Sequence, residues 1–381
     1  MKNTGWIIGM VLALSSACMA GEELPLRKDL NESVEMIRVK PGIFGFALET
    51  TLFKPDGPGP FPLVVINHGK EFGLPAHQPR SRYSLIAQEF LQRGYAVALP
   101  MRRGFANSGG MFPDGSCQNL APIAEQQADD IERVIAYFRQ QPDIDAERIL
   151  VIGQSAGGFT SMALASREIA GVKAVLNFAG GLRFTSLECN WESALKNVFA
   201  GLGKRARVDS MWFYAENDSL FPPELARSLH ATYREGGGKA ELVLYPPFRQ
   251  DGHGMFGTRE GLEQIWWPKV EAFLQARGLP TKVLGARYRD LPVPPPSGHA
   301  ESAKDFNAFP LSSEQCKNLY RQFVATAPLP RAFAVSDDGA CGAWADYEEP
   351  APRALQYCRQ YAKRDCHLYL VNDTVVWPVQ N

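Results

Sequence analysis

The chain has 381 residues, of which 45% are hydrophobic and 21% are charged, with a formal net charge of −1. This is the composition of a globular protein long enough for one large core and a smaller second unit. A nearly neutral chain has no electrostatic footprint for nucleic acid, and beyond residue 20 no apolar run is long enough to span a bilayer. We therefore expect neither a nucleic-acid partner nor an integral membrane span in the body of the protein.

The first twenty residues have the pattern of a secretory signal peptide. Lys2 supplies a positive charge, residues 6–16 are apolar, and "ACMA" ends in small residues. We expect cleavage after Ala20 and a periplasmic or secreted mature chain. Two alternatives stay open: an uncleaved anchor, for which the apolar run is short, and a lipid anchor at Cys18, because "SSAC" loosely resembles a lipoprotein cleavage box.

Residues 33–279 alternate between apolar strands and amphipathic helices. Strands are predicted at 34–40, 46–55, 61–69, 95–100, 148–153, 173–180, 210–216 and 240–246. Helices are predicted at 81–94, 127–141, 222–238, 260–278 and directly after Ser155. Near-continuous aliphatic strands alternating with helices are typical of a mostly parallel sheet covered on both faces. We therefore predict an α/β domain over residues 21–279.

A proline-rich linker, residues 280–299, follows this domain. Beyond it, residues 300–381 contain two helix-like runs, 312–327 and 351–364, each followed by two short strands around an Asp-Gly or Asn-Asp turn. The pattern predicts a small, separate α+β domain.

Without Cys18 the chain keeps six cysteines, an even number that indicates disulfides in an exported protein. Four of them fall within residues 300–381 and allow three pairings, of which we favour Cys316–Cys341 with Cys358–Cys366. A zinc site is the alternative for this cluster. No C-x2-C or H-x3-H spacing supports it, so we expect no bound metal.

The stretch "RILVIGQSAGG" places Ser155 between a buried strand and a helix. A sharp strand-to-helix turn needs small residues such as Gly153 and Gly157, because its backbone is strained and adjacent elements crowd it. Such a turn exposes the hydroxyl above the sheet, beside a helix N-terminus. The pattern G-x-S-x-G is common by chance, but its position between a strand and a helix makes Ser155 a candidate nucleophile.

A serine nucleophile needs a base and an acid, which a parallel sheet supplies at the ends of later strands. Asp218 follows the strand at 210–216 and His253 the strand at 240–246, in the order Ser, Asp, His. Asp251 and Glu216 are the rival acids; Asp251 is too close to His253 to come from a separate strand end, and Glu216 lies nearer its own strand. The other candidate bases are interpreted as structural or surface histidines: His230, His299 and His367.

Acyl transfer also needs two backbone N–H donors for the oxyanion. Ala156 supplies one because it follows the nucleophile at a helix start. Lys70 supplies the other because Gly69, at the end of the strand 61–69, permits a turn that aims the next amide inward. For His68 we favour hydrogen bonds to the loop backbone over metal ligation.

The segments "NHGK", "RRGFANSGG", "PDIDAERILVIGQSAGG", "AENDSLFPP" and "DGHG" together resemble the α/β-hydrolase superfamily, in its dienelactone hydrolase and prolyl-oligopeptidase-like branch. The resemblance covers residues 33–279 and implies an eight-stranded sheet with one antiparallel strand near its start. It also implies that Ser155, Asp218 and His253 form a catalytic triad. Dienelactone hydrolases proper carry a cysteine nucleophile, which argues against dienelactone as the substrate here. The resemblance does not extend to residues 300–381 and assigns them no function.

These residues predict a serine hydrolase that cleaves carboxylic esters through an acyl-enzyme and needs no cofactor. A serine peptidase is the alternative; related exported peptidases carry a large N-terminal propeller, whereas a short segment precedes "NHG" here. A third hypothesis, a non-catalytic binding protein on the same fold, fits the intact Ser, Asp, His order less well. We expect a small ester or a short peptide as the substrate, and the partner of residues 300–381 stays open.

Further hypotheses concern the loops around Ser155. Cys117 and Cys189 both follow strand ends on that side, so we predict a disulfide between them. Segment 182–207 is a candidate cap over the site. Four basic residues in these loops, Lys70, Arg102, Arg103 and Arg249, would favour an anionic substrate; the favoured alternative is that they pair with Glu71, Asp114 or Asp251.

Overall fold

The structure is a computed structural model that describes residues 25–71, 73–113, 116, 120–184, 189–288, 294–310, 313–345 and 349–377. The predicted signal peptide, residues 1–20, lies outside these ranges together with Cys18. Within the ranges, no helix is both long enough and apolar enough to cross a membrane.

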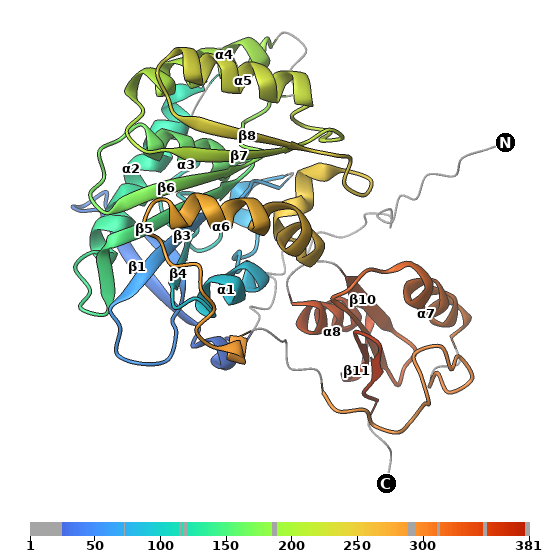
Figure 1. The fold of residues 1–381 in the computed structure, drawn as a ribbon. Helices are drawn as coiled ribbons and strands as arrows, with labels where there is room; N and C mark the ends of the chain where they lie inside the picture. Colours follow the sequence, from blue (N-terminus) through green and yellow to red (C-terminus); the bar gives the residue numbers. More distant parts are fainter. Residues whose placement is uncertain are drawn as a thin grey trace, which may run out of the picture.

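An eight-stranded sheet forms the centre of the larger part of the chain (Figure 1). In chain order its strands are β1 (Ser33–Lys40), β2 (Phe46–Phe53), β3 (Phe61–Asn67), β4 (Ala96–Pro100), β5 (Ile144–Gln154), β6 (Val172–Phe178), β7 (Ser210–Ala215) and β8 (Ala240–Tyr245). They lie side by side in the order β1-β2-β4-β3-β5-β6-β7-β8. β2 alone runs against its neighbours, β1 and β4, and all other pairs are parallel. The predicted sheet, mostly parallel with one antiparallel strand near the start, is confirmed.

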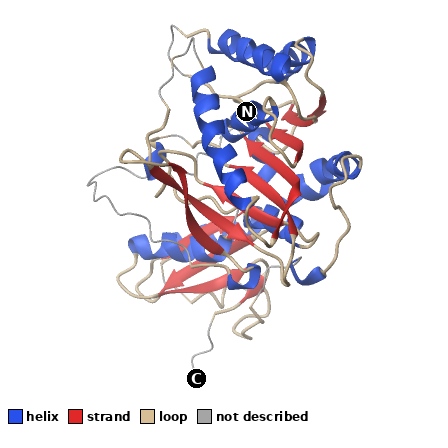
Figure 2. Ribbon diagram, turned by 90° about the vertical axis from the view of Figure 1, so that its left-hand side faces the viewer, coloured by secondary structure: helices blue, strands red, loops and turns tan. Residues whose placement is uncertain are grey.

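Helices cover both faces of this sheet because successive residues of each strand point to opposite sides (Figure 2). In β3, Leu63 and Val65 face one core, and Val64 and Ile66 face the other. The first core packs against α2 (Ala121–Phe138), α3 (Ala156–Ala165), α4 (Trp191–Arg205) and α5 (Pro223–Glu235). The second packs against α1 (Ser84–Leu91) and α6 (Trp267–Gln275). Short helical turns are η1 (Lys28–Leu30), η2 (Pro75–His77), η3 (Gly252–Gly257), η4 (Gly261–Trp266) and η5 (Ala286–Tyr288).

Several predicted segments differ from the structure, among them the helix expected at 127–141, which as α2 already begins at Ala121. The helix expected at 260–278 starts as a π-helical turn, η4, and becomes α-helical only in α6. The candidate cap, 182–207, contains α4, which packs on α5. Phe199 of α4 contacts Trp212 of β7 with a distance of 5.3 Å between ring centroids. The cap hypothesis is therefore wrong for α4, because the apolar face of this helix is buried in the sheet core.

The described residues from 294 to 377, here called the C-terminal module, form a second sheet with its own cores. Its elements are α7 (Glu314–Thr326), β9 (Arg331–Ser336), β10 (Cys341–Ala345), α8 (Pro350–Tyr361), β11 (Cys366–Val371) and β12 (Thr374–Val375). The four strands are antiparallel, in the order β10-β9-β11-β12. The predicted helix-and-hairpin pattern is confirmed.

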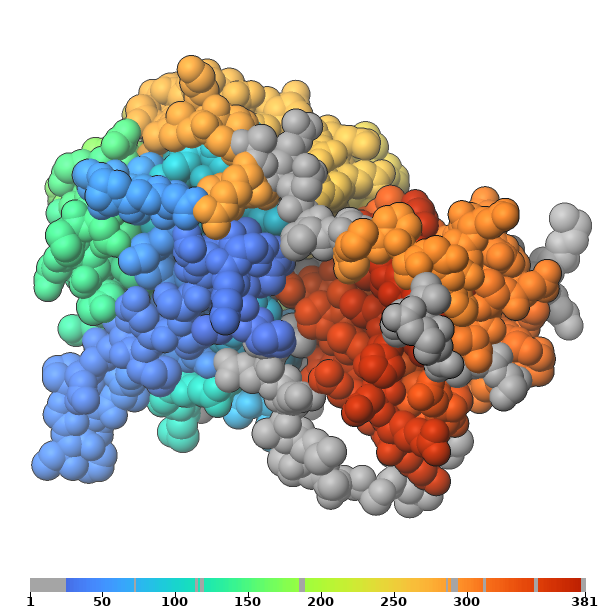
Figure 3. All heavy atoms as spheres, turned by 90° about the horizontal axis from the view of Figure 1, so that it is seen from below, coloured from blue at the N-terminus to red at the C-terminus, as the bar shows by residue number. Residues whose placement is uncertain are grey.

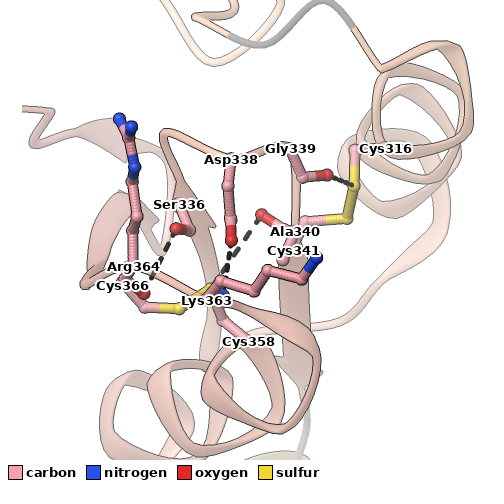
Figure 4. Close-up of a disulfide and its surroundings, with 10 residues drawn as sticks. All are labelled: Cys316, Ser336, Asp338, Gly339, Ala340, Cys341, Cys358, Lys363, Arg364 and Cys366. Carbon is pink, nitrogen blue, oxygen red and sulfur yellow. Dashed lines mark hydrogen bonds between the residues drawn. A yellow bond between two sulfur atoms is a disulfide. The ribbon is translucent and has the colours of Figure 1, made fainter.

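Two disulfides connect the helices of the C-terminal module to its sheet. Cys316 of α7 is bonded to Cys341 of β10, and Cys358 of α8 to Cys366 of β11, which are the predicted pairings. Figure 4 shows the β9–β10 turn between them, where the Lys363 amide donates a hydrogen bond to the Asp338 carboxylate. Because a crosslink restricts the unfolded chain more than the folded one, both bridges stabilise this small unit.

Candidate active site

Ser155 occupies the turn between β5 and α3 with a strained backbone. Its φ is +55° and its ψ is −123°, a region that residues other than glycine rarely adopt. Surrounding hydrogen bonds hold it there: the Ser155 amide donates to the Phe178 carbonyl (2.9 Å), and the Ser155 carbonyl accepts from the amides of Phe159 (3.0 Å) and Gly181 (3.2 Å). The end of β6 and the first turn of α3 thus fix the backbone of Ser155 between them.

The two glycines of the G-x-S-x-G stretch are required by close backbone contacts. A Cβ on Gly153 would lie 2.2 Å from the Gly157 carbonyl oxygen, and a Cβ on Gly157 would lie 2.0 Å from the Asn67 carbonyl oxygen. The expected crowding around this turn is therefore present, since neither position accepts a larger residue without a shift of the backbone.

Asp218, in the loop after β7, contacts His253, in the loop after β8. The His253 Nδ1 lies 3.1 Å from Asp218 Oδ2 and 3.2 Å from Oδ1. The Asp218 carboxylate is completely buried and also accepts hydrogen bonds from the amides of Leu220 and Phe221, each at 2.9 Å. Because Nδ1–H donates to the carboxylate, the neutral ring carries its lone pair on Nε2, the atom that a base requires.

The structure also separates Asp218 from its two rivals. Glu216 is exposed. Asp251 accepts hydrogen bonds from the Ser219 hydroxyl (2.5 Å), the Ser219 amide (3.2 Å) and the His253 amide (2.9 Å). It therefore links the loop after β7 to the loop after β8, a connection that the sequence did not indicate.

The loops of Ser155 and His253 meet through Gln154. Its side-chain amide donates to the His253 carbonyl oxygen at 3.3 Å, and a Cβ on Gly69 would lie 2.3 Å from Gln154 Oε1. Within the described part of the chain, no hydrogen bond joins the Ser155 hydroxyl to the His253 ring. Catalytic hydrogen bonds commonly tighten only when substrate binds.

The predicted oxyanion donors are the backbone amides of Ala156 and Lys70. Ala156 is the first residue of α3, where the helix dipole is positive. Lys70 follows Gly69 in the loop after β3. Among the described residues, neither amide donates a hydrogen bond to another protein group. Their role as oxyanion donors stays a prediction.

Arg102 holds the loop that carries the Lys70 amide. This arginine is fully buried, and its guanidinium donates to the carbonyl oxygens of His68 and Gly69. The Arg102 amide donates to His68 Nε2 (3.1 Å), while His68 Nδ1 donates to the Gly69 carbonyl (2.6 Å). Burial, together with the charge of Arg102, lowers the pKa of His68 well below its usual value, so the ring stays neutral. The expected contacts of His68 with the loop backbone are confirmed.

The proposed anion-binding role of the four basic residues is not supported by their contacts. Arg103 pairs with Asp130 (2.5 Å) and Arg249 with Glu260 (3.0 Å), while Arg102 contacts carbonyl oxygens. The Lys70 ammonium donates to two loop carbonyls, those of Glu71 (3.2 Å) and Gly73 (3.3 Å). The expected carboxylate partners were wrong for Arg102 and Arg103. Asp114 lies outside the described residues, and the pairing expected for Arg249 stays a prediction.

Replacing Arg102 with methionine is expected to lower kcat about 10-fold or more, because a small displacement of a reacting group has large effects on rate. KM and the melting temperature should change little, since a buried guanidinium that contacts carbonyls rather than a carboxylate gives little net stability. Arg102→Lys keeps the positive charge but cannot donate to the carbonyl oxygens of His68 and Gly69 in the same way, so it should give an intermediate kcat. Wild-type kcat in Arg102→Met would contradict this role.

Replacing Asp251 with asparagine tests the link between the acid and base loops. Burial alone would raise the pKa of Asp251, but hydrogen bonds from Ser219 and from the His253 amide lower it below 3.8. Its stabilising effect is therefore present above that usual value and is lost as the pH falls through its lowered pKa. The melting temperature of Asp251→Asn should lie below that of the wild type at neutral pH, and the difference should shrink in acid. A difference independent of pH would argue against this.

Cys189 takes part in a disulfide. Its predicted partner, Cys117, lies outside the described residues. Peptide mapping of the oxidised protein is expected to recover one crosslinked peptide with these two cysteines; recovery of Cys117 as a free thiol would contradict the prediction.

Within the described ranges, no group of three or more His, Cys, Asp or Glu residues is arranged to hold a metal ion.

Comparisons with known proteins cover parts of the chain. Residues 45–190, which include Ser155 but end before Asp218, match the family described as X-Pro dipeptidyl-peptidase (S15 family). The quorum-quenching protein AidA of Acinetobacter baumannii (strain MDR-ZJ06) is 28% identical over 162 residues, which is 42% of this chain and 49% of that protein. The match thus spans about half the length of that relative.

Two solved structures illustrate the range of similar folds. A putative dienelactone hydrolase from Klebsiella pneumoniae subsp. pneumoniae MGH 78578 has a TM-score of 0.46 and 17% identity, covering 64% of this chain and 99% of that one. A putative dipeptidyl aminopeptidase IV from Bacteroides ovatus ATCC 8483 has a TM-score of 0.49 and 18% identity, covering 65% of this chain and 36% of that one. The strand order with its single antiparallel member, the serine at the turn between β5 and α3, and the family match together identify the chain as a member of the α/β-hydrolase superfamily.

Proposed function

We propose that this protein is a serine hydrolase that cleaves carboxylic esters through an acyl-enzyme. One observation carries the proposal: Ser155 sits at a strained strand-to-helix turn on the same sheet edge as a buried Asp218–His253 hydrogen bond. This is the set of groups that a serine nucleophile needs, because its hydroxyl is unreactive without a base and the base needs an orienting acid.

In the proposed reaction, His253 Nε2 removes the Ser155 proton as Oγ attacks the ester carbonyl carbon. The carbonyl electron pair moves to oxygen, which accepts hydrogen bonds from the Lys70 and Ala156 amides. The intermediate collapses, the alcohol leaves with the proton from His253, and the acyl group stays on Ser155. Water then loses a proton to His253, attacks the acyl carbon and releases the carboxylic acid, which restores the serine hydroxyl.

A fluorophosphonate probe tests the nucleophile. We expect one covalent adduct, located by peptide mapping at Ser155, and its formation should stop when the protein is unfolded beforehand. Absence of labelling on folded protein would favour the third hypothesis, a binding protein that uses a hydrolase fold without catalysis.

A serine peptidase is the second candidate, and the match of residues 45–190 to a dipeptidyl-peptidase family favours it. We place esters first because an alcohol leaves the tetrahedral intermediate more readily than an amine. Comparing kcat/KM for nitrophenyl acyl esters and aminoacyl anilides separates the two; faster turnover of anilides would reverse the order. Since one relative is named as a quorum-quenching protein, a quorum-signal reporter assay belongs in the same screen.

We also propose that the protein is exported. All five cysteines that the structure describes are disulfide-bonded, and disulfides persist in oxidising compartments. The intact mass of protein from a periplasmic fraction should correspond to a chain that begins at residue 21. Accumulation of the unprocessed chain in the cytoplasm would contradict export.

A further inference from the structure

Glu349 belongs to the C-terminal module, but its side chain is buried against the larger part of the chain. It immediately precedes α8 and has a left-handed backbone with a φ of 57°. Residues at this position commonly cap their own helix, yet the Glu349 side chain makes no capping hydrogen bond. Its carboxylate instead contacts Arg27 Nη1 (2.9 Å) and Arg82 Nη1 (3.9 Å). Figure 3 shows this side of the module against the N-terminal part of the chain.

These two arginines belong to a buried ion cluster, defined as Arg27, Glu32, Arg80, Arg82 and Glu349. Arg82 Nε and Arg80 Nη1 both donate to Glu32 Oε1 at 2.8 Å. Burial alone would lower the pKa of Arg27, but the carboxylates of Asp29 and Glu349 raise it, so Arg27 stays protonated. Glu32, Arg80, Arg82 and Glu349 are each less than 10% exposed. Glu349 therefore supplies one of the two carboxylates of this cluster, beside its three guanidinium groups.

The ion cluster lies at one end of the segment 68–83, which connects β3 to α1. Arg80 and Arg82 form that end. The other end carries the Lys70 amide and is held by Arg102. Between the ends, the side chain of Gln78 accepts from the Glu71 amide (3.1 Å) and donates to the Glu71 carbonyl (2.9 Å). Arg102 thus holds one end of the segment and the ion cluster holds the other. The two hydrogen bonds between Gln78 and Glu71 connect residues between these ends.

Removal of the Glu349 carboxylate would leave Arg27 and Arg82 buried with less compensating charge. A buried charge that loses a partner becomes less favourable, so the partly buried Arg27 side chain would turn toward water, while Arg82 would keep Glu32 as its carboxylate within the cluster. The end of the segment 68–83 that precedes α1 would then be less tightly fixed. The position of the Lys70 amide would then vary, whereas an oxyanion donor acts only when it is held in place.

We propose that Glu349 is a positioning residue through which the C-terminal module docks on the larger part of the chain and fixes the segment 68–83. The role assigned to the Lys70 amide rests on the proposed function, whereas docking does not. The C-terminal module then stabilises the larger part of the chain, and it binds there through contacts between Glu349 and the arginines of the ion cluster.

The test compares full-length Glu349→Gln with the wild type and with Glu314→Gln. Glu314 lies on α7 of the same module, its side chain is 72% exposed, and it pairs only with Lys317 among the described residues, so it controls for the chemical change. Hydrogen–deuterium exchange should rise in peptides covering residues 25–32 and 70–83 in Glu349→Gln and stay at the wild-type level in Glu314→Gln. Wild-type exchange of residues 70–83 in Glu349→Gln would overturn the proposal.

Kinetics on an activated ester add a readout that general destabilisation would not give. We expect kcat of Glu349→Gln to fall on the order of 10-fold with little change in KM, less than the roughly 10²–10³-fold loss of an oxyanion donor. The double variant Arg27→Gln/Glu349→Gln should be no worse than Glu349→Gln alone, since the two residues act as a pair. Additive losses would overturn the pairing.

Two outcomes need separate interpretation. If Glu349→Gln does not fold, Glu349→Asp keeps the charge on a shorter side chain and is used in its place, with a smaller rise in exchange expected. If the wild-type protein hydrolyses no ester or anilide, the proposed function fails, but the exchange experiment still decides whether the module docks through Glu349.

Discussion

Replacing Ser155 with alanine is expected to lower kcat by on the order of 10⁴-fold or more, with little change in stability. The residual rate would come from the oxyanion donors and from substrate binding, which the substitution leaves in place. Alanine retains the Cβ, so the fold tolerates it, although the strained φ of +55° at this position remains. Steady-state kinetics with the best ester and labelling by the fluorophosphonate probe both measure the effect.

Ser166→Ala is the matched control for this experiment. Ser166 lies at the C-terminal end of α3, and its hydroxyl donates to the Ala163 carbonyl (2.7 Å), away from Asp218 and His253. The control should keep wild-type kcat and labelling. Labelling of Ser155→Ala at the wild-type rate would show that the nucleophile is a different residue.

Replacing Asp218 with asparagine should lower kcat by about 10³–10⁴-fold, by analogy with the acid of other triads. Asp218 Oδ1 accepts hydrogen bonds from the amides of Leu220 and Phe221, so the oxygen of an asparagine would take that place. Its NH2 group would then face His253 Nδ1 and donate to it. The ring would carry its proton on Nε2, the wrong tautomer for removing a proton from Ser155.

The same experiment distinguishes Asp218 from its neighbour. Glu216→Gln makes the equivalent change at the exposed rival in the same loop and should leave kcat unchanged. In Glu216→Gln, the pH dependence of kcat/KM should still show the titration of the catalytic base of the free enzyme. In Asp218→Asn this titration should be absent. A larger loss in Glu216→Gln than in Asp218→Asn would overturn the assignment.

Much of this arrangement was predictable from the sequence because its signals are local. Aliphatic runs marked the strands, and the carboxyl ends of parallel strands meet at one edge, so Ser155, Asp218 and His253 could be placed there from their positions alone. The contact between His253 and Asp218, 35 residues apart, followed from that topology. In the C-terminal module, the pairings favoured among three alternatives, Cys316–Cys341 and Cys358–Cys366, are the ones that the structure contains.

The charged residues in loops were decided by tertiary structure alone. Arg102 was expected to pair with a loop carboxylate or, less favoured, to contact an anionic substrate, yet it is buried and holds the backbone at His68, 34 residues earlier. Glu349 gave no signal, and its partner Arg27 lies 322 residues away. From the sequence, a charged residue in a loop is predicted to be solvent-exposed. Its burial depends on which distant parts of the chain pack against it and not on the residues next to it in the sequence. The sequence by itself determined the fold class and the candidate triad, whose positions follow from periodicity and strand order; only the packed structure decided which charges hold the site in place.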